Sequence, residues 1–318
     1  MPNRLIVPPI GVAFSFVSLS TVFALTLSGV AAADSPSAVA SAASVVDSGA
    51  ELERVVGDCK FTEGPASDAA GNVYFTDQPN DRIVRIGLDG SVSDFMKPAG
   101  RSNGMFFAPD GKLIACADGN TEMWEIDVQA GTHRVLFGNF QDNRLNGPND
   151  VWVHPSGTMY FTDPFYKRPW WDHDVRPQPA QSLYAADRDG GNVRLVDDRF
   201  KTPNGIVGDA GRSLLFVADI GDSKTYVYRI DADGSLVDRK LFCEEGSDGM
   251  TLDREGNLYL TGKAGVTVYD REGVKKEVIA VPRGWTANVC FGGEGHRTLF
   301  ITASDAVFTI RTRVQGLR

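Results

Sequence analysis

A segment of 15 or 16 residues recurs six times along the chain, and no other feature constrains the possible folds as strongly. Each copy begins with a polar residue, crosses a short apolar stretch and a glycine-containing turn, and ends in a second apolar stretch. The copies begin 40 to 55 residues apart, and they are EGPASDAAGNVYFTD from Glu63, NGMFFAPDGKLIACAD from Asn103, NDVWVHPSGTMYFTD from Asn149, NGIVGDAGRSLLFVAD from Asn204, DGMTLDREGNLYLTG from Asp248 and NVCFGGEGHRTLFITA from Asn288. A period of this length built only of strands and turns is typical of the blades of a β-propeller.

Two further strand patterns complete most of these units. After NVYFTD, for example, the segments RIVRIGLDG and SVSDFMKP follow, and the glycine of the LDG turn is typical of a hairpin. The sixth unit is one strand short, and residues 51–56 match the outer strand of the other units. We expect residues 51–56 to complete that sheet, because closure removes two exposed strand edges. The sequence therefore predicts an all-β fold, a six-bladed β-propeller over residues 50–318 closed by an N-terminal strand in the last blade.

The first 33 residues are typical of a secretory signal peptide. Arg4 supplies a positive charge, an apolar run from Gly11 to Val30 follows, and Ala31-Ala32-Ala33 offers a cleavage site. An uncleaved membrane anchor is the alternative, because the apolar run is nearly long enough to span a bilayer. Residues 34–49 are small and polar, and they predict a flexible linker. We expect an exported protein, periplasmic or secreted, without stable membrane insertion once residues 1–33 are removed.

Charge and cysteine content exclude several classes of partner. The net charge of −9 and the isoelectric point near 5.0 argue against nucleic acid, whose phosphates need a basic surface. The cysteines form no C-x-x-C pair, so a cysteine zinc site is not expected and buried free thiols are favoured; they are Cys59, Cys116, Cys243 and Cys290. We expect a small-molecule substrate, and the sequence leaves the oligomeric state open.

The polar residue that opens each copy predicts a site on the propeller axis. The innermost strands of a propeller line a central channel, so equivalent positions in the six blades converge there. These positions all carry an oxygen-bearing side chain, and they are Glu63, Asn103, Asn149, Asn204, Asp248 and Asn288. Ca²⁺ is bound by such carboxylate and amide oxygens, Mg²⁺ is an alternative, and the lack of His and Cys disfavours zinc. The other interpretation is that each polar side chain only caps a turn.

One insertion interrupts the third unit. The segment PFYKRPWWDHDVRPQPAQS, residues 164–182, contains Phe165, Tyr166 and two tryptophans. Long aromatic loops often cover a site, and this one should emerge at the mouth of the channel, so it is a candidate lid or specificity wall. An oligomer contact or plain packing are the alternatives. One G-x-S-x-G match occurs, at residues 100–104, but no histidine belongs to the axial set, which disfavours a classical serine hydrolase.

Five motifs in a fixed order carry a resemblance that spans essentially the whole mature chain. They are EGP at 63–65, RLNGPNDV at 144–151, YFTDP at 160–164, TPNGI at 202–206 and SDGM at 247–250. With these motifs the chain resembles the gluconolactonase, senescence marker protein (regucalcin) and luciferin-regenerating-enzyme family.

The resemblance implies a six-bladed propeller that hydrolyses lactones with one divalent metal, usually Ca²⁺, with Mg²⁺, Mn²⁺ and Zn²⁺ as alternatives. Carried over by motif, the metal ligands would be Glu63, Asn149, Asn204 and Asp248. Asp248 would also act as general base or nucleophile, Asp150 is the reserve base, and Asn103 and Asp150 would lie near the substrate.

Other functions and one departure stay open. Diisopropyl fluorophosphatase shares the architecture and a similar metal site, so an organophosphate hydrolase is an alternative, as is a non-catalytic binding propeller with structural calcium. A strictosidine-synthase-like propeller is a further alternative, but it would not need the metal set. Animal family members carry a sugar-contacting arginine two residues before the asparagine that matches Asn149, where this chain has Gly147. Arg144 is the nearest arginine and the candidate in its place, and an aldonolactone substrate is therefore left open.

Overall fold

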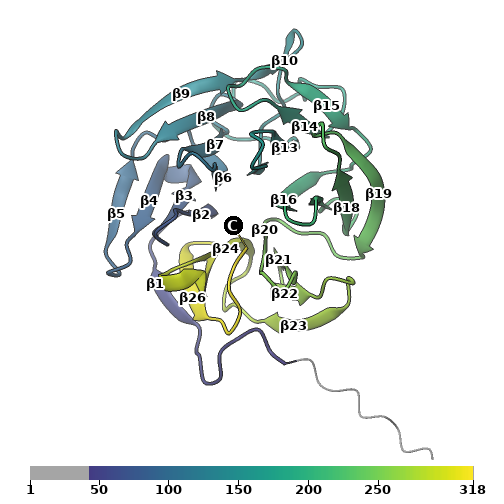
Figure 1. Cartoon of the computed structure of the whole chain (residues 1–318). Helices are drawn as coiled ribbons and strands as arrows, with labels where there is room; N and C mark the ends of the chain where they lie inside the picture. Colours follow the sequence, from purple (N-terminus) through teal and green to yellow (C-terminus); the bar gives the residue numbers. More distant parts are fainter. Residues whose placement is uncertain (1–42, 318) are drawn as a thin grey trace, which may run out of the picture. The chain divides into compact units, whose positions relative to one another are not determined.

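The structure is a computed structural model that describes residues 43–317, and these residues form a six-bladed β-propeller (Figure 1). Each blade is a four-stranded antiparallel sheet whose strands follow one another from the axis outward. The first three sheets contain β2 (Thr62–Ser67), β3 (Val73–Asp77), β4 (Arg82–Ile86) and β5 (Val92–Met96); β6 (Ser102–Phe107), β7 (Leu113–Ala117), β8 (Glu122–Asp127) and β9 (Thr132–Phe137); and β12 (Val151–Val153), β13 (Met159–Asp163), β14 (Ser182–Ala186) and β15 (Arg194–Asp197). The predicted fold is confirmed.

The other three sheets repeat this order. They contain β16 (Pro203–Asp209), β17 (Leu214–Asp219), β18 (Lys224–Ile230) and β19 (Leu236–Cys243); β20 (Met250–Leu252), β21 (Leu258–Gly262), β22 (Gly265–Tyr269) and β23 (Lys275–Ile279); and β24 (Thr286–Gly292), β25 (Thr298–Ala303), β26 (Ala306–Arg311) and β1 (Glu53–Val56). Three small elements lie outside the sheets: the hairpin of β10 (Asn139–Phe140) and β11 (Asn143–Arg144), and the 3₁₀ turns η1 (Gln78–Asn80) and η2 (Glu294–His296).

The ring is closed as the sequence predicts, because β1 pairs antiparallel with β26 from the opposite end of the chain. The packed chain begins before β1. Val45, inside the stretch predicted as a linker, is fully buried beside Val289 and Phe291, and Val46 forms a β-bridge with Thr312. Packing contacts therefore start at Val45, before the boundary at residue 50 that the sequence suggests.

The predicted signal peptide, residues 1–33, and the first part of the predicted linker lie outside the described residues. Within residues 43–317, no helix is long and apolar enough to cross a membrane.

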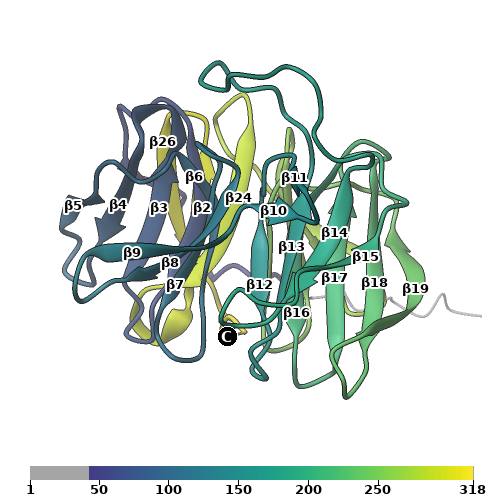
Figure 2. The same ribbon diagram turned by 90° about the horizontal axis from the view of Figure 1, so that it is seen from above.

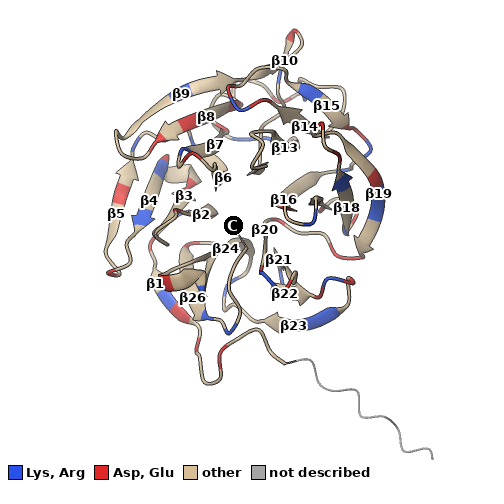
Figure 3. Ribbon diagram, viewed as in Figure 1, with Lys and Arg blue, Asp and Glu red and all other residues tan. Residues whose placement is uncertain are grey.

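The core lies between neighbouring blades, where apolar side chains of adjacent sheets pack face to face. One cluster joins Trp152 and Tyr160 of the third sheet to Phe216 of the fourth and Leu258 of the fifth. Charged residues lie mainly on outer strands such as β5, β19 and β23, and the inner strands are largely uncharged (Figure 3). All four cysteines are buried and free. The interior is thus apolar, which makes a polar cluster on the axis stand out.

Candidate active site at the propeller axis

The six polar residues that open the repeats lie on or directly before the inner strands, and all are buried. Their exposed fractions lie between 2% and 9% for Glu63, Asn103, Asn149, Asn204, Asp248 and Asn288. Asp150, the residue after Asn149, is also buried, at 5% exposure. Buried polar side chains are costly unless they find partners, so this concentration on the axis needs a chemical explanation.

Irregular strand pairing aims these side chains at the axis. In four blades the register between the first and second strands shifts next to the polar residue, between Glu63 and Ala66 in the first blade, for example; the other three shifts follow Ser102, Pro203 and Thr286. Bulges of this kind bend a strand and re-aim side chains. In the third and fifth blades the ladder becomes regular only after the polar residue, at Val151 and Met250.

Glycine follows the axial residue in four blades, because the next blade leaves no room for a side chain there. A Cβ on Gly104 would lie 2.3 Å from Asp150 Oδ1, and one on Gly249 would lie 2.0 Å from the side chain of Asn288. The other two such positions are Gly64 and Gly205. In the third blade Asp150 stands at this position instead, so it adds a carboxylate at the centre of the ring.

Hydrogen bonds link Asp248 to two other side chains of the site. Asn204 Nδ2 donates to Asp248 Oδ1 (2.8 Å) and to the Tyr166 hydroxyl oxygen (3.0 Å). Trp285 Nε1 donates to Asp248 Oδ2 (2.5 Å). Both carboxylate oxygens of Asp248 therefore accept a hydrogen bond, which fixes the plane of the group.

Some axial side chains also serve their own strand. Glu63 Oε2 accepts the N–H of Gly64 (3.0 Å), and Asp150 Oδ1 accepts the N–H of Val151 (2.9 Å). Asn288 Oδ1 does the same with the following residue (2.8 Å). The turn-capping interpretation thus accounts for part of these side chains. It does not account for Asn204, whose Oδ1 is buried and has no hydrogen-bond partner.

Burial and mutual repulsion disfavour charge on the three carboxyl groups. Burial, with the charges of Asp248 and Asp150, raises the pKa of Glu63 well above its ordinary value. Burial raises the pKa of Asp150 to about 7, and it also raises the pKa of Asp248, against the hydrogen bonds from Trp285 and Asn204. None of the three carboxylates forms an ion pair with another residue of the described part. A cation at this place would remove the electrostatic conflict.

The donor set fits a hard cation through mixed ligands. In the part of the chain that the structure describes, no group of three or more His, Cys, Asp and Glu side chains could hold a metal ion by itself. A cation would therefore need amide oxygens in addition to the carboxylates of Glu63 and Asp248. The unpartnered Oδ1 of Asn204 is such an oxygen, and Asn149 lies in the same ring. Oxygen-only sets of this kind suit Ca²⁺ better than zinc.

The insertion, residues 164–182, connects β13 to β14 and projects beyond the strand ends (Figure 2). It reaches the axial cluster through Tyr166. Phe165 packs inside the insertion, with its ring centre 5.7 Å from that of Trp171. A Cβ on Gly147 would lie 2.7 Å from the Trp171 ring, so the insertion occupies the space that a side chain at 147 would need.

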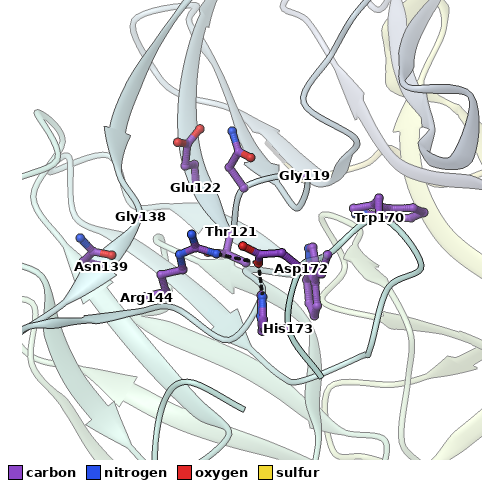
Figure 4. A pocket seen from close by; sticks show the side chains of 11 residues that line it. Gly119, Thr121, Glu122, Gly138, Asn139, Arg144, Trp170, Asp172 and His173 are labelled. Carbon is purple, nitrogen blue, oxygen red and sulfur yellow. Dashed lines mark hydrogen bonds and ion pairs between the residues drawn. The ribbon is translucent and has the colours of Figure 1, made fainter. Parts of the chain in front are cut away.

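Arg144 does not lie with the axial residues. It is 55% exposed and lines a separate pocket of about 520 Å³ beside the insertion (Figure 4). Its Nη1 lies 3.2 Å from Asp172 Oδ1, and the same oxygen lies 3.0 Å from His173 Nδ1. The structure thus brings Tyr166, but not Arg144, to the candidate site.

A second cavity continues along the axis behind the cluster. It measures about 580 Å³ and is lined by apolar side chains of the inner strands, such as Met105 and Trp152. Asp150 and Asn288 of the axial cluster also line it, as does Leu317, near the chain end that lies over the axis in Figure 1. Asp150 and Asn288 thus belong both to the axial cluster and to the lining of this cavity.

Sequence reasoning missed Trp285 and the threonines that brace the ring. Thr76 Oγ1 donates to the carbonyl oxygen of Asn103 (3.2 Å), and Thr162 Oγ1 donates to that of Asn204 (2.7 Å), so each ties one blade to the next. The repeated FTD motif was the signal for these threonines. Trp285 lies in an irregular segment before β24, three residues ahead of the axial asparagine, and no pattern marks it.

The fold and the buried, oxygen-rich ring define the class: a six-bladed β-propeller with its candidate site on the axis. Residues 61–305 match the family model of the SMP-30/Gluconolactonase/LRE-like region. The chain belongs to this family, which confirms the resemblance that the five motifs carry.

Named relatives and a solved structure share most of the chain. The gluconolactonase of Zymomonas mobilis is 29% identical over 301 residues, which cover 86% of this chain and 84% of that protein. The diisopropyl-fluorophosphatase of Loligo vulgaris is 24% identical over 279 residues, covering 79% and 88%. The solved structure of a gluconolactonase from Xanthomonas campestris is 26% identical, with a TM-score of 0.76, and covers 83% of this chain and 89% of that one.

Proposed function

We propose that the protein hydrolyses lactones to hydroxy acids and depends on a divalent cation, with Ca²⁺ as first choice and Mg²⁺, Mn²⁺ and Zn²⁺ as alternatives. The observation that carries this proposal is the ring of buried oxygen-bearing side chains with an unpartnered amide oxygen on Asn204. The gluconolactonases among the relatives support the reaction type.

Glu63, Asn149, Asn204 and Asp248 would hold the cation. When bound, a divalent cation polarises a carbonyl oxygen and lowers the pKa of a water molecule. The chain's own residues keep the donor set in place, because Tyr166 and Trp285 contact Asn204 and Asp248 from outside the ring. Asn103, Phe165 and Tyr166 would bound the lactone on the side of the mouth.

Asp248 would move the proton. Water attacks the lactone carbonyl carbon, the ring C–O bond breaks, and the proton lost by water passes through the Asp248 carboxylate to the leaving alkoxide oxygen. Each Asp248 oxygen accepts one hydrogen bond, so each keeps one further lone pair, of which one would serve the cation and the other the proton. Asp150 would be the reserve base, and its side chain is held by the N–H groups of Val151 (2.9 Å) and Ile206 (3.4 Å).

The experiment is acid release from a lactone panel by the purified chain, in the presence of Ca²⁺, after chelation, and after single metals are added back. Aldonolactones and aliphatic and aromatic lactones would make up the panel. We expect turnover of at least one lactone, lost on chelation and restored by a metal. Turnover that survives complete removal of metal would overturn the proposed dependence on a cation. No turnover with metal bound would favour a non-catalytic binding propeller.

A second candidate function is organophosphate hydrolysis, favoured by the similarity to the Loligo vulgaris enzyme. The same assay with diisopropyl fluorophosphate, read as fluoride release, separates the two. Faster turnover of the organophosphate than of every lactone would make it the better description of the site.

We further propose that residues 1–33 direct export and are removed. Expression in a bacterial host with fractionation of the periplasm, followed by mass measurement of the mature chain, tests this. We expect a chain that starts at Asp34 outside the cytoplasm. A full-length chain in the membrane fraction would favour the anchor instead.

A further inference from the structure

Four blades carry an aspartate at the end of the second strand: Asp77, Asp118, Asp163 and Asp219. Three of them make the same kind of contact, and the fourth, at the mouth of the channel, does not. Asp77 accepts the backbone N–H groups of Lys60 (2.9 Å) and Phe61 (3.4 Å), in the loop that leads into its own blade. Asp163 and Asp219 accept the corresponding loop N–H groups of their blades, at 2.8 to 2.9 Å. Three of the four therefore have a structural role in holding the entrance loop.

The carboxylate of Asp118, the fourth, accepts hydrogen bonds only from side chains, whereas Asp77 holds Arg82 of its own blade in addition to the loop. Asp118 Oδ2 accepts Gln78 Nε2 (2.9 Å) and Arg168 Nε (2.7 Å), and its backbone oxygen accepts Trp171 Nε1 (2.7 Å). Asp118 is 1% exposed, so a buried carboxylate of the second blade anchors an arginine of the insertion. Burial raises the pKa of Asp118 to about 6, and the Arg168 charge opposes that shift.

The hydrogen bond to Asp118 uses only one of the three guanidinium nitrogens of Arg168. Only its Nε is hydrogen-bonded to a described residue, and neither terminal nitrogen is among the buried unpartnered atoms. The side chain is 21% exposed, and its guanidinium carbon lies 5.5 Å from the Tyr166 ring centre. Tyr166 in turn contacts Asn204, and the Arg168 charge favours the ionised form of Asp248. The free guanidinium edge thus lies one side chain away from the axial cluster.

A second arginine adds positive charge beside it. The guanidinium carbons of Arg101 and Arg168 lie 4.6 and 5.8 Å from the ring centre of Trp170. Arg101 donates to the Pro79 carbonyl oxygen (3.0 Å) and forms no ion pair with a described residue. Two guanidinium groups therefore flank the Trp170 ring on the insertion side of the mouth, and of these two only Arg168 pairs with a described carboxylate, that of Asp118, in a chain whose net charge is −9.

We propose that Arg168 binds a carboxylate on the substrate, so that the preferred substrates are lactones that carry an acidic group away from the reacting carbonyl. The inference rests on the proposed lactone hydrolysis. A guanidinium held at Nε offers its two terminal nitrogens as parallel donors, the geometry that matches a carboxylate. Asp118 acts as the positioning residue, since it fixes the plane of that fork from a buried site.

The experiment compares two lactones of the same ring size, D-glucaro-1,4-lactone, which carries a carboxylate, and D-glucono-1,4-lactone, which carries a hydroxyl there. We expect the wild type to prefer the acidic lactone in kcat/KM by about 10-fold or more, in line with a charged hydrogen bond. Arg168→Gln should remove the preference, and Arg168→Lys should keep only part of it, because a lysine lacks the planar fork. Asp118→Asn should reduce the preference with little change in the unfolding midpoint.

The matched control is Lys167→Gln, which removes one positive charge from the same insertion. Lys167 is 64% exposed and pairs with Asp174, so the preference should stay. Equal turnover of the two lactones by the wild type, or an equal loss for Lys167→Gln and Arg168→Gln, would overturn the inference.

A binding readout separates this inference from the proposed function. Calorimetric titration with D-glucarate should show at least about 10-fold weaker binding to Arg168→Gln than to the wild type. If no lactone is opened but glucarate binding still depends on Arg168, lactone hydrolysis fails and the carboxylate site stands. If lactones are opened but glucarate binding is the same in both proteins, the carboxylate site fails.

Discussion

The axial ring and the insertion present two ways of building a site on one propeller. The ring takes one side chain from each blade, at equivalent positions that the repeat reveals, and buries all of them. The insertion occurs once, in the third blade, and remains partly exposed. Repetition therefore provides the converging oxygen atoms, whereas the single insertion provides side chains that the repeat does not contain.

The two regions are also held in place differently. The ring is braced from blade to blade, with glycines such as Gly104 in contact with the next blade and threonines such as Thr162 bonded to its backbone. The insertion is joined to the propeller by side-chain hydrogen bonds of its own, from Gln178 to the β10–β11 hairpin and with Asp118 and Asn204 near the mouth. Changes in the ring should therefore affect all substrates and the fold, and changes in the insertion should affect some substrates more than others.

The largest effect is expected for Asp248→Asn. The change keeps the shape of the side chain but removes a negative charge and the proposed proton carrier, so kcat/KM for every lactone should fall by about 10³-fold or more. Lactone turnover under saturating metal measures it. Calorimetric metal titration of the variant is the control, because lost metal binding and lost base give the same kinetic result. Wild-type turnover with metal bound would remove Asp248 from the chemistry.

The next effect tests the bracing of the ring. Gly104→Ala would place a Cβ 2.5 Å from the Asn149 carbonyl oxygen and 2.3 Å from Asp150 Oδ1, so the free energy of unfolding should fall by roughly 3 kcal/mol. Urea unfolding measures it. The matched control is Gly262→Ala on β21, where a Cβ would meet nothing within 4 Å and stability should stay within about 1 kcal/mol. Equal unfolding midpoints for the two variants would contradict close contact between blades.

A smaller effect is expected for Trp285→Phe. The variant keeps the ring but removes the N–H that donates to Asp248 Oδ2, so kcat should fall by about 10-fold for acidic and neutral lactones alike. The control is Trp124→Phe, which removes a comparable N–H bond to Glu122 away from the axis and should leave turnover unchanged. An unchanged kcat in Trp285→Phe would show that Asp248 does not need this contact.

Much of the ring could be predicted from the sequence, because six equivalent residues such as Glu63 and Asn204 must converge if the blades do. The closing strand followed from the same count of strands. The position of the insertion could be predicted but not its contacts. Nothing in the pattern distinguishes Asp118 from Asp77, although Asp77 holds its entrance loop and Arg82 of its own blade, whereas Asp118 holds an arginine of the insertion. Trp285 was missed for the same reason, since a contact made by an irregular loop leaves no periodic signal.

The smallest effect is expected for Arg144→Gln, a change that tests whether an arginine close to Asn149 in the sequence also lies close to the site in space. Arg144 lies five residues before Asn149, but it is 55% exposed and pairs with Asp172 in the separate pocket beside the insertion. Exposed ion pairs contribute little, so Arg144→Gln should change kcat/KM by less than about 2-fold for both lactones. The same assay applied to Arg168→Gln provides the contrast. Arg168 lies farther from Asn149 in the sequence than Arg144 does, but its guanidinium group packs against Tyr166, which contacts the axial cluster. A larger loss for Arg144→Gln than for Arg168→Gln would reverse the comparison and extend the substrate site into the pocket of Figure 4.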